Sequence, residues 1–311
     1  MEPQKPLFSE AKVKTRIAPT PSGYLHLGNV LSFALTWALA RKQNGTVVLR
    51  IDDLDNTRFR PEYLHNIFDT LQFMGLDYDE GPANPDDFLR NYSQHLRLPL
   101  YREYLHQLRE QGLLYACPCS RSQIAAASPA GRYPLTCRST QVPLEQPGNA
   151  WRILVPDHSM VTFHDQFLGK AYQVPLWEQM PDFVVRRKDG IPAYQIASVC
   201  DDLQMGINLV VRGQDLLNST AAQVFLAQCS GSAAFSQIQF FHHPLLLQHD
   251  GTKLSKSEGA ESLYGMRRKG MTTTELWRLL ARLLGWQNAN ITDARSFLKR
   301  FRPEDVPPVV Q

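Results

Sequence analysis

The chain lacks any apolar run of the roughly 20 residues that crossing a bilayer requires. Its first residues, Met1 to Leu7, contain no apolar core, so we expect no secretory signal peptide. A strong charge imbalance is also missing, because 33 Lys and Arg face 30 Asp and Glu, for a formal net charge of +3. Composition alone therefore does not indicate nucleic-acid binding. These absences predict a cytoplasmic protein with no membrane partner.

Cysteine is scarce, with five residues in 311. Three of the five cluster, and an odd, clustered set is more typical of thiols that bind a metal than of disulfides. Hydrophobic residues make up 43% of the chain, which is enough for a packed core. The length suits one large α/β domain with an insertion, or two modest domains.

The first fifty residues have the pattern of a βαβ unit. The short apolar run Val13–Ile17 and the β-branched run Thr46–Ile51 each predict a strand. Between them, Leu31–Gln43 is rich in Leu and Ala and predicts a helix. A strand, a Gly-containing turn, a helix and a second strand are typical of a Rossmann-type parallel sheet.

Later segments predict how the domain is divided. Helical spacing returns at 61–74, 101–112, 219–229 and 274–286, and 207–213 has the composition of a late strand. Regular patterns vanish in 115–147, which predicts an irregular insertion, whereas 151–174 is β-rich. We therefore expect the two halves of the catalytic domain at 1–114 and 182–258, an inserted zinc-bearing subdomain at 115–181, and a small helical C-terminal region at 259–311.

Two short motifs far apart carry the chemistry. The first is APTPSGYLHLGN, from Ala18 to Asn29, and the second is KLSKS, from Lys253 to Ser257. Backbone N–H groups at the start of a helix favour phosphate, and lysines neutralise charge on a leaving pyrophosphate. Each motif alone could be chance or a solvated loop. Together, in this order, they predict an ATP site that forms aminoacyl-adenylates.

The motifs assign roles to individual side chains. We expect His26 to donate to a phosphate oxygen, and Gly28 to let the nucleotide approach closely. The candidate catalytic residues are His26, Lys253 and Lys256. The candidate ATP ligands are His26, Gly28, Asn29 and Lys256, with Mg²⁺ accompanying the nucleotide.

Three further runs carry a resemblance to a known family. They are RIAPTPSG from Arg16, RIDDLD from Arg50 and VRGQDLL from Val211. With the KLSKS loop they make the chain similar to the glutamyl branch of the class I aminoacyl-tRNA synthetases over most of residues 14–258. The resemblance implies a Rossmann-type α/β class I catalytic domain that uses L-glutamate and ATP.

The resemblance also implies a glutamate pocket. Arg16 and Arg212 would hold carboxylate oxygens, because the arginine fork pairs bidentately with a carboxylate. An acidic residue in the Arg50–Asp52 run would meet the α-ammonium, and the family usually has Glu where this chain has Asp52. Alternatively, the charged residues that follow Ile51 form a salt-bridge cluster with Arg50 at the strand end. The implied glutamate ligands are Arg16, Ile17, Ala18, Pro19, Thr20, Asp52, Tyr194 and Arg212, and the alternative cluster is Arg50, Asp52, Asp53 and Asp55.

Three cysteines predict a metal site. Cys117, Cys119 and Cys137 offer three thiolates, which close a tetrahedral zinc site with one further donor. The residues themselves leave that donor open among His, Asp and water, and the alternative is a set of reduced, partly buried thiols. Similarity to the zinc site of the glutamyl-Q tRNA(Asp) synthetases implies Tyr133 as the fourth ligand of one structural Zn²⁺.

The predicted acceptor follows from the same resemblance. The sequence ends at Gln311, soon after the second motif, so we expect no anticodon-binding domain and no obligatory protein partner. The implied reaction is tRNA-independent activation of glutamate, then transfer to queuosine in the anticodon loop of tRNA(Asp), a splayed loop base of the kind that proteins read. The alternatives are a truncated glutamyl-tRNA synthetase that charges the acceptor end, a silent RNA-binding paralogue, and another adenylate-forming nucleotidyltransferase that acts on a small acid.

Overall fold

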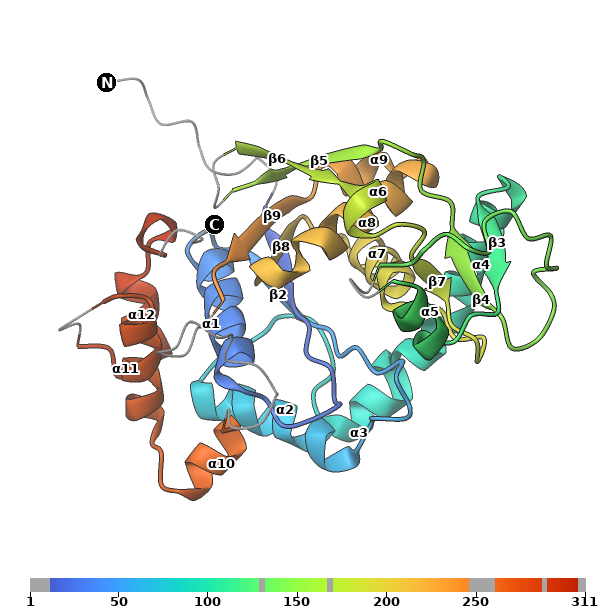
Figure 1. The fold of residues 1–311 in the computed structure, drawn as a ribbon. Coiled ribbons are helices and arrows are strands. Elements are labelled where there is room, and N and C mark those ends of the chain that lie inside the picture. Colours follow the sequence, from blue (N-terminus) through green and yellow to red (C-terminus); the bar gives the residue numbers. More distant parts are fainter. Residues whose placement is uncertain (1–11, 129–131, 167–169, 246–260, 287–289, 307–311) are drawn as a thin grey trace, which may run out of the picture.

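Two β-sheets organise the chain, which the computed structural model describes over residues 12–128, 132–166, 170–245, 261–286 and 290–306 (Figure 1). The larger sheet has the order β2-β1-β8-β9-β5-β6, and the smaller has the order β3-β4-β7. The strands are β1 (Lys14–Ile17), β2 (Thr46–Leu49), β3 (Leu114–Cys117), β4 (Ala150–Ile153), β5 (Met160–Asp165), β6 (Lys170–Pro175), β7 (Val184–Arg186), β8 (Leu209–Gly213) and β9 (Gln239–His243).

The centre of the larger sheet is parallel, as the sequence predicts. Strand β1 pairs in parallel with both β2 and β8, and β8 pairs in parallel with β9. The antiparallel hairpin β5–β6 then extends the sheet beyond β9. The predicted βαβ unit is present as β1, helix α1 (Leu27–Arg41) and β2. Helix α1 begins four residues before its predicted start because the His26 side chain caps it.

Helices cover both faces of the larger sheet. On one face Val47, Leu209 and Val211 pack with α1, and on the other Val48 and Val210 pack with a second group of helices. This alternation produces three layers, because successive strand residues point to opposite faces. The helices of the first group are α1, α2 (Pro61–Met74), α11 (Thr273–Leu283) and α12 (Ala294–Arg300), and those of the second are α4 (Leu98–Glu110), α7 (Tyr194–Gln204) and α8 (Leu217–Cys229).

The range predicted as an insertion, 115–181, does not coincide with one structural unit. Its hairpin β5–β6 belongs to the larger sheet, whereas β3 and β4 form the smaller sheet with β7, which lies outside that range. The stretch 115–147, predicted to be irregular, contains helix α5 (Arg121–Ala127). Ser120 and Gln123 form a capping box at its start, which is the sequence signal that the prediction missed.

The described residues at the C-terminal end are mainly helical. Helix α11 lies where the amphipathic pattern predicts, and α12 packs on α1. The remaining short helices are α3 (Pro85–Asp87), α6 (Leu176–Gln179), α9 (Ala233–Ser236) and α10 (Leu263–Arg268). In the described part of the chain, every helix is too short or too polar to cross a bilayer.

Candidate active site

A cavity of about 410 Å³ lies at the carboxyl ends of β1 and β8, beside the first turn of α1. Ligands of parallel α/β sheets bind at this edge, where strands end and helices begin. The predicted site residues that line the cavity are Arg16, Ile17, Ala18, His26, Gly28, Asn29, Tyr194 and Arg212. Residues from four elements, β1, α1, α7 and β8, thus share one cavity.

Two predicted glutamate ligands lie beside the cavity rather than in its lining. Thr20 and Asp52 line an adjoining groove of about 1190 Å³, and Tyr194 lines both the groove and the cavity. Pro19 lines neither, and its carbonyl oxygen accepts a hydrogen bond of 2.9 Å from the Asp52 N–H. Pro19 therefore lies outside both spaces, where its carbonyl group helps to hold the backbone of Asp52.

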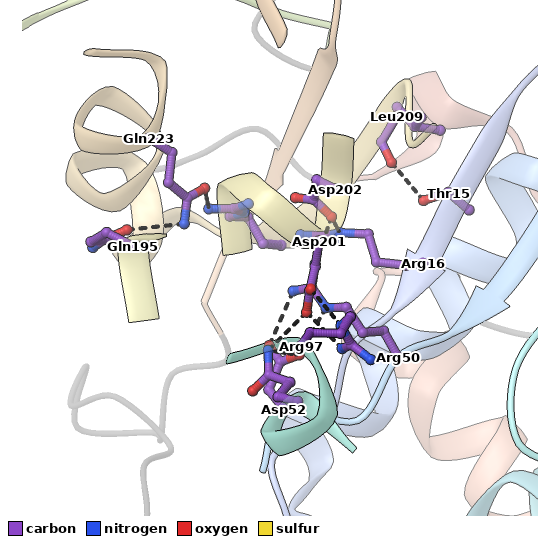
Figure 2. Close-up of polar contacts among 12 residues, drawn as sticks. Thr15, Arg16, Arg50, Asp52, Arg97, Gln195, Asp201, Asp202, Leu209 and Gln223 are labelled. Atoms are coloured by element: carbon purple, nitrogen blue, oxygen red, sulfur yellow. Dashed lines mark hydrogen bonds and ion pairs between the residues drawn. The ribbon is translucent and has the colours of Figure 1, made fainter. Parts of the chain in front are cut away.

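Arg16 and Arg50 are held by one buried carboxylate. Asp202 Oδ1 accepts from Arg16 Nε at 2.9 Å and from Arg50 Nη1 at 2.7 Å (Figure 2). Arg50 also pairs with both oxygens of Asp52, at 2.8 and 3.0 Å. Burial raises the pKa of Asp52, although the Arg50 guanidinium opposes this shift. Of the cluster considered as an alternative, Arg50 and Asp52 pair, whereas Asp53 accepts from Ser93 Oγ and Asp55 pairs with Arg58.

A second ion pair joins Asp201 to Arg97. Asp201 accepts from Arg97 Nε at 2.7 Å and from Arg97 Nη2 at 2.8 Å, and Gln94 donates to it at 2.9 Å. Burial alone would raise the pKa of Asp201, but Arg97 and Arg50 outweigh it and the pKa falls below its usual value. Asp201 and Asp202 are adjacent on α7, so this helix aligns both arginine pairs.

Within the described residues, Arg212 has no such carboxylate. It is 4% exposed, and its Nη1 donates to the neutral Gln223 at 3.0 Å. Its Nη2 is buried and has no hydrogen-bond partner in the described part of the chain. Burial lowers the pKa of Arg212 to about 10; Tyr194 opposes this shift, and Arg16 adds to it. A buried cation of this kind is complementary to a carboxylate that enters the cavity.

The first turn of α1 holds His26 in one orientation. The Gly28 N–H donates to His26 Nδ1 at 3.1 Å, and the His26 N–H donates to Asn29 Oδ1 at 3.2 Å. Because Nδ1 accepts, the proton of the neutral ring is on Nε2. A Cβ at Gly28 would lie 3.1 Å from the imidazole ring, so only glycine leaves the ring undisturbed. This arrangement suits a donor to a phosphate oxygen at a helix N-terminus.

The second motif, with Lys253 and Lys256, lies outside the described residues. The described chain before it ends at Leu245, which lines the cavity. After it, Ser262 forms a β-bridge with His26, and the Leu263 N–H donates to the Leu25 carbonyl at 2.8 Å. The described residues before the second motif thus reach the cavity, and those after it contact the first motif.

The three predicted thiol ligands come together. The sulfur atoms of Cys117, Cys119 and Cys137 all lie within 4.8 Å of one another, and those of Cys119 and Cys137 are 3.3 Å apart. Tetrahedral zinc with bonds of about 2.3 Å separates its sulfur ligands by roughly 3.8 Å. The Tyr133 hydroxyl accepts from the Cys137 N–H at 3.1 Å, which places it at the cluster. The three thiols lie close enough together to hold a metal ion, which would tie β3 to the loop after α5, and Tyr133 lies beside them.

Electrostatics at the thiols favour a bound cation. Burial raises the pKa of Cys117, but hydrogen bonds from Tyr133 and Arg152 outweigh it and bring that pKa to about 7. Burial and the neighbouring thiols raise the pKa of Cys119 to about 11. Without a cation, the first thiolate disfavours ionisation of a second thiol. A bound metal ion would instead stabilise all three thiolates.

Sequence reasoning missed three residues. Asp202 joins Arg16 to Arg50 from α7, Gln223 holds Arg212 from α8, and His243 lines the cavity at the end of β9. Burial lowers the pKa of His243 to about 4, so its ring is neutral at pH 7. No motif marked these residues. Two adjacent acids, Asp201 and Asp202, after the apolar stretch Ile196 to Cys200 were the one signal that the sequence offered.

Comparisons with known proteins agree on one family. A model for the catalytic domain of class I tRNA synthetases (E and Q) matches residues 12–304. A glutamyl-Q tRNA(Asp) synthetase of Symbiobacterium thermophilum is 39% identical over 87% of this chain and 86% of its own length. A glutamate–tRNA ligase of Nitrosomonas europaea is also 39% identical, over 89% of this chain, which spans only 58% of the ligase. The solved glutamate-tRNA synthetase of Elizabethkingia anophelis has a TM-score of 0.76 at 26% identity, covering 95% of this chain and 67% of its own.

Proposed function

The chain belongs to the catalytic-domain family of class I tRNA synthetases (E and Q), and from this premise we propose that it is a glutamyl-queuosine tRNA(Asp) synthetase. In the first step a glutamate α-carboxylate oxygen attacks the α-phosphorus of ATP, and pyrophosphate leaves. In the second step a hydroxyl of the queuosine cyclopentenediol attacks the carbonyl carbon of the adenylate, AMP leaves, and the hydroxyl proton is lost. The product is a glutamyl ester of the modified wobble base.

The unpaired charge of Arg212 is the observation that supports glutamate as the amino-acid substrate. Arg16 and two further guanidinium groups share three buried carboxylates, whereas Gln223 is the one hydrogen-bond partner of Arg212 among the residues that the structure describes. The side-chain carboxylate of glutamate would supply the missing charge and accept from the unpartnered Nη2. Glutamine would leave the buried charge uncompensated, and aspartate is one methylene shorter, so we expect neither to be activated efficiently.

The first turn of α1 supports the ATP half of the site. Its N–H groups and dipole favour the phosphates, and His26 Nε2–H is a donor to them. Lys253 and Lys256 would neutralise the developing pyrophosphate charge, with Mg²⁺ bound to the nucleotide. The ribose and the adenine base would then extend toward Gly213 and Leu245.

The adjoining groove supports a large acceptor. It joins the cavity at Tyr194 and has far more room than a small acceptor molecule needs. Its basic lining residues outnumber its acidic ones, and a basic groove attracts a phosphate backbone. The basic residues are Arg58, Arg121, Arg152, Arg187 and Lys188, and the acidic residues are Asp52, Asp55 and Asp189.

Queuosine as the acceptor rests on one relative. The Symbiobacterium protein is named as a glutamyl-Q tRNA(Asp) synthetase, and its match covers 86% of its length. Charging of the tRNA acceptor end is the second candidate, because a glutamate–tRNA ligase is equally similar at 39% identity. The two candidates share the activation step and differ only in the hydroxyl that receives the glutamyl group.

Pyrophosphate exchange tests the activation step. We expect exchange with glutamate in the absence of any tRNA, and at least about 100-fold lower kcat/KM with glutamine or aspartate. Exchange that starts only when tRNA is added would contradict tRNA-independent activation. Equal rates with glutamine would contradict the role of the Arg212 charge.

A further inference from the structure

A tight turn of the chain separates the groove from a second cavity. Its volume is about 380 Å³, and it separates α4 from β4 and the end of β7. The residues around it are Arg102, Leu105, His106, Arg109, Trp151, Arg186, Asp189, Gly190 and Ile191. None of them lines the cavity that holds Arg16 and Arg212, so a role for this second cavity remains to be assigned.

The cavity carries an excess of positive charge. Three guanidinium groups line it, against the single carboxylate of Asp189, which pairs with Arg187. Arg109 is paired with Glu145. Among the residues that the structure describes, no carboxylate forms an ion pair with Arg102 or Arg186. These two arginines therefore retain charge that an anionic ligand would neutralise.

Arg186 is positioned for such a ligand. Its guanidinium carbon lies 4.5 Å from the centroid of the Trp151 ring, so the indole covers one face and leaves the in-plane N–H groups for an anion. Gly190, at φ +84°, brings the turn close, and a Cβ there would lie 3.2 Å from Arg186 Nη2. Burial lowers the pKa of Arg186; Asp189 opposes this shift, and Arg102 adds to it.

We propose that this cavity binds a backbone phosphate of the tRNA substrate, held by Arg102 and Arg186. The inference rests on the proposed function, because it assumes that the acceptor is a tRNA. Asp189 lines both this cavity and the groove, so one turn separates them and a polynucleotide in the groove would reach across it. Phosphates fix the register of a nucleic acid on a protein without reading its sequence. The cavity thus positions the tRNA while the groove presents its acceptor nucleotide.

Two substitutions test the site. Arg102 is exposed, so Arg102→Ala removes a charge without opening the core, and Arg186→Lys keeps the charge but removes the fork. Arg278→Ala, on the exposed side of α11, is the matched control for loss of one surface charge. Each variant is measured for tRNA(Asp) and tRNA(Glu) affinity across a salt series, for glutamyl transfer, and for pyrophosphate exchange.

The expected result separates RNA binding from chemistry. Arg102→Ala should weaken tRNA binding about five- to ten-fold and reduce the slope of log affinity against log salt concentration by about 1. Arg186→Lys should weaken binding with little change in slope, and exchange should stay within about two-fold of wild type for both. Arg278→Ala should change none of these quantities.

Other outcomes overturn the inference in distinguishable ways. If both variants bind tRNA with the affinity and the salt slope of Arg278→Ala, the phosphate site is wrong while the proposed function stands. If inorganic phosphate changes Trp151 fluorescence but tRNA binding is unaffected by the substitutions, the cavity takes a small anion instead. If the wild-type protein binds tRNA but transfers no glutamate, the proposed function fails, and the salt slopes alone decide the inference. If it binds no tRNA, both fail.

Discussion

Arg212 and Gln223 form a hydrogen bond of 3.0 Å that joins a buried cation to a neutral amide. The other three arginines of the cluster each pair with an aspartate, at 2.7 to 2.9 Å. We infer from this asymmetry that Arg212 is the arginine most open to a substrate carboxylate. Arg16 and Arg50 are both held by Asp202.

Arg212→Ala should therefore reduce activation of glutamate far more than folding. We expect kcat/KM for glutamate in pyrophosphate exchange to fall about 100-fold, since a charged hydrogen bond contributes roughly 1.5–3 kcal/mol. The KM for ATP should change little. Arg278→Ala is the control. A variant with unchanged kcat/KM would remove Arg212 from the amino-acid pocket.

Gly28→Ala should reduce adenylate formation by at least about ten-fold. The added methyl group would press on the His26 ring from 3.1 Å and shift the donor that faces the phosphates. Stability should not fall, because alanine is favoured over glycine within a helix by about 0.5–1 kcal/mol. Exchange kinetics and thermal unfolding are measured on the same sample. Normal exchange in this variant would show that the position of His26 is not critical.

Cys137→Ala should lower bound zinc from about one ion per chain to near zero, as measured by elemental analysis. Because Cys119 lines the groove and not the cavity, we expect at least a ten-fold (~1.4 kcal/mol) loss of transfer with smaller effects on exchange. Cys229→Ala, at a half-buried cysteine outside the cluster, is the matched control. Wild-type protein that is fully active and free of zinc would contradict the predicted metal site.

His243 should make stability depend on pH. Burial holds its pKa at about 4 in the folded protein, while the unfolded chain binds this proton below about 6.5. The contribution of His243 to stability is therefore complete above pH 6.5 and is lost as the pH falls toward 4, by at most about 3 kcal/mol. His242 shifts in the same direction and remains in the variant, so the comparison isolates one ring.

The measurement is urea unfolding from pH 7 to 4.5 of wild type and His243→Gln. The variant should lose less stability over this range than wild type does, and the exposed-residue control His65→Gln should follow wild type. Parallel curves for wild type and His243→Gln would show that the ring is not held neutral.

Local pattern was sufficient to predict the first βαβ unit and the helix that ends at Gly75. Thr46 to Leu49 is a short β-branched run, and Pro61 and Gly75 mark the two ends of α2. The motif also indicated a helix after the first strand, although that helix begins at Leu27, four residues before its predicted start. These features depend on neighbours within a few residues, which a single sequence displays.

The rest depends on contacts between distant segments. Arg16 and Asp202 meet across 186 residues, and no spacing in the sequence shows that one carboxylate serves two arginines. The hairpin β5–β6 adds to the larger sheet through β9, although its sequence lies among residues predicted as an insertion. Strand partners are decided by packing between layers, which local periodicity does not encode.

The central claim is that the glutamyl group goes to queuosine, and the most direct test is transfer of labelled glutamate to tRNA(Asp). The acceptor is prepared with and without queuosine, and each form with and without its acceptor end. We predict label on the queuosine-bearing tRNA alone, retained when the acceptor end is removed. Label on unmodified tRNA that disappears with the acceptor end would contradict this account and identify a minimal charging synthetase.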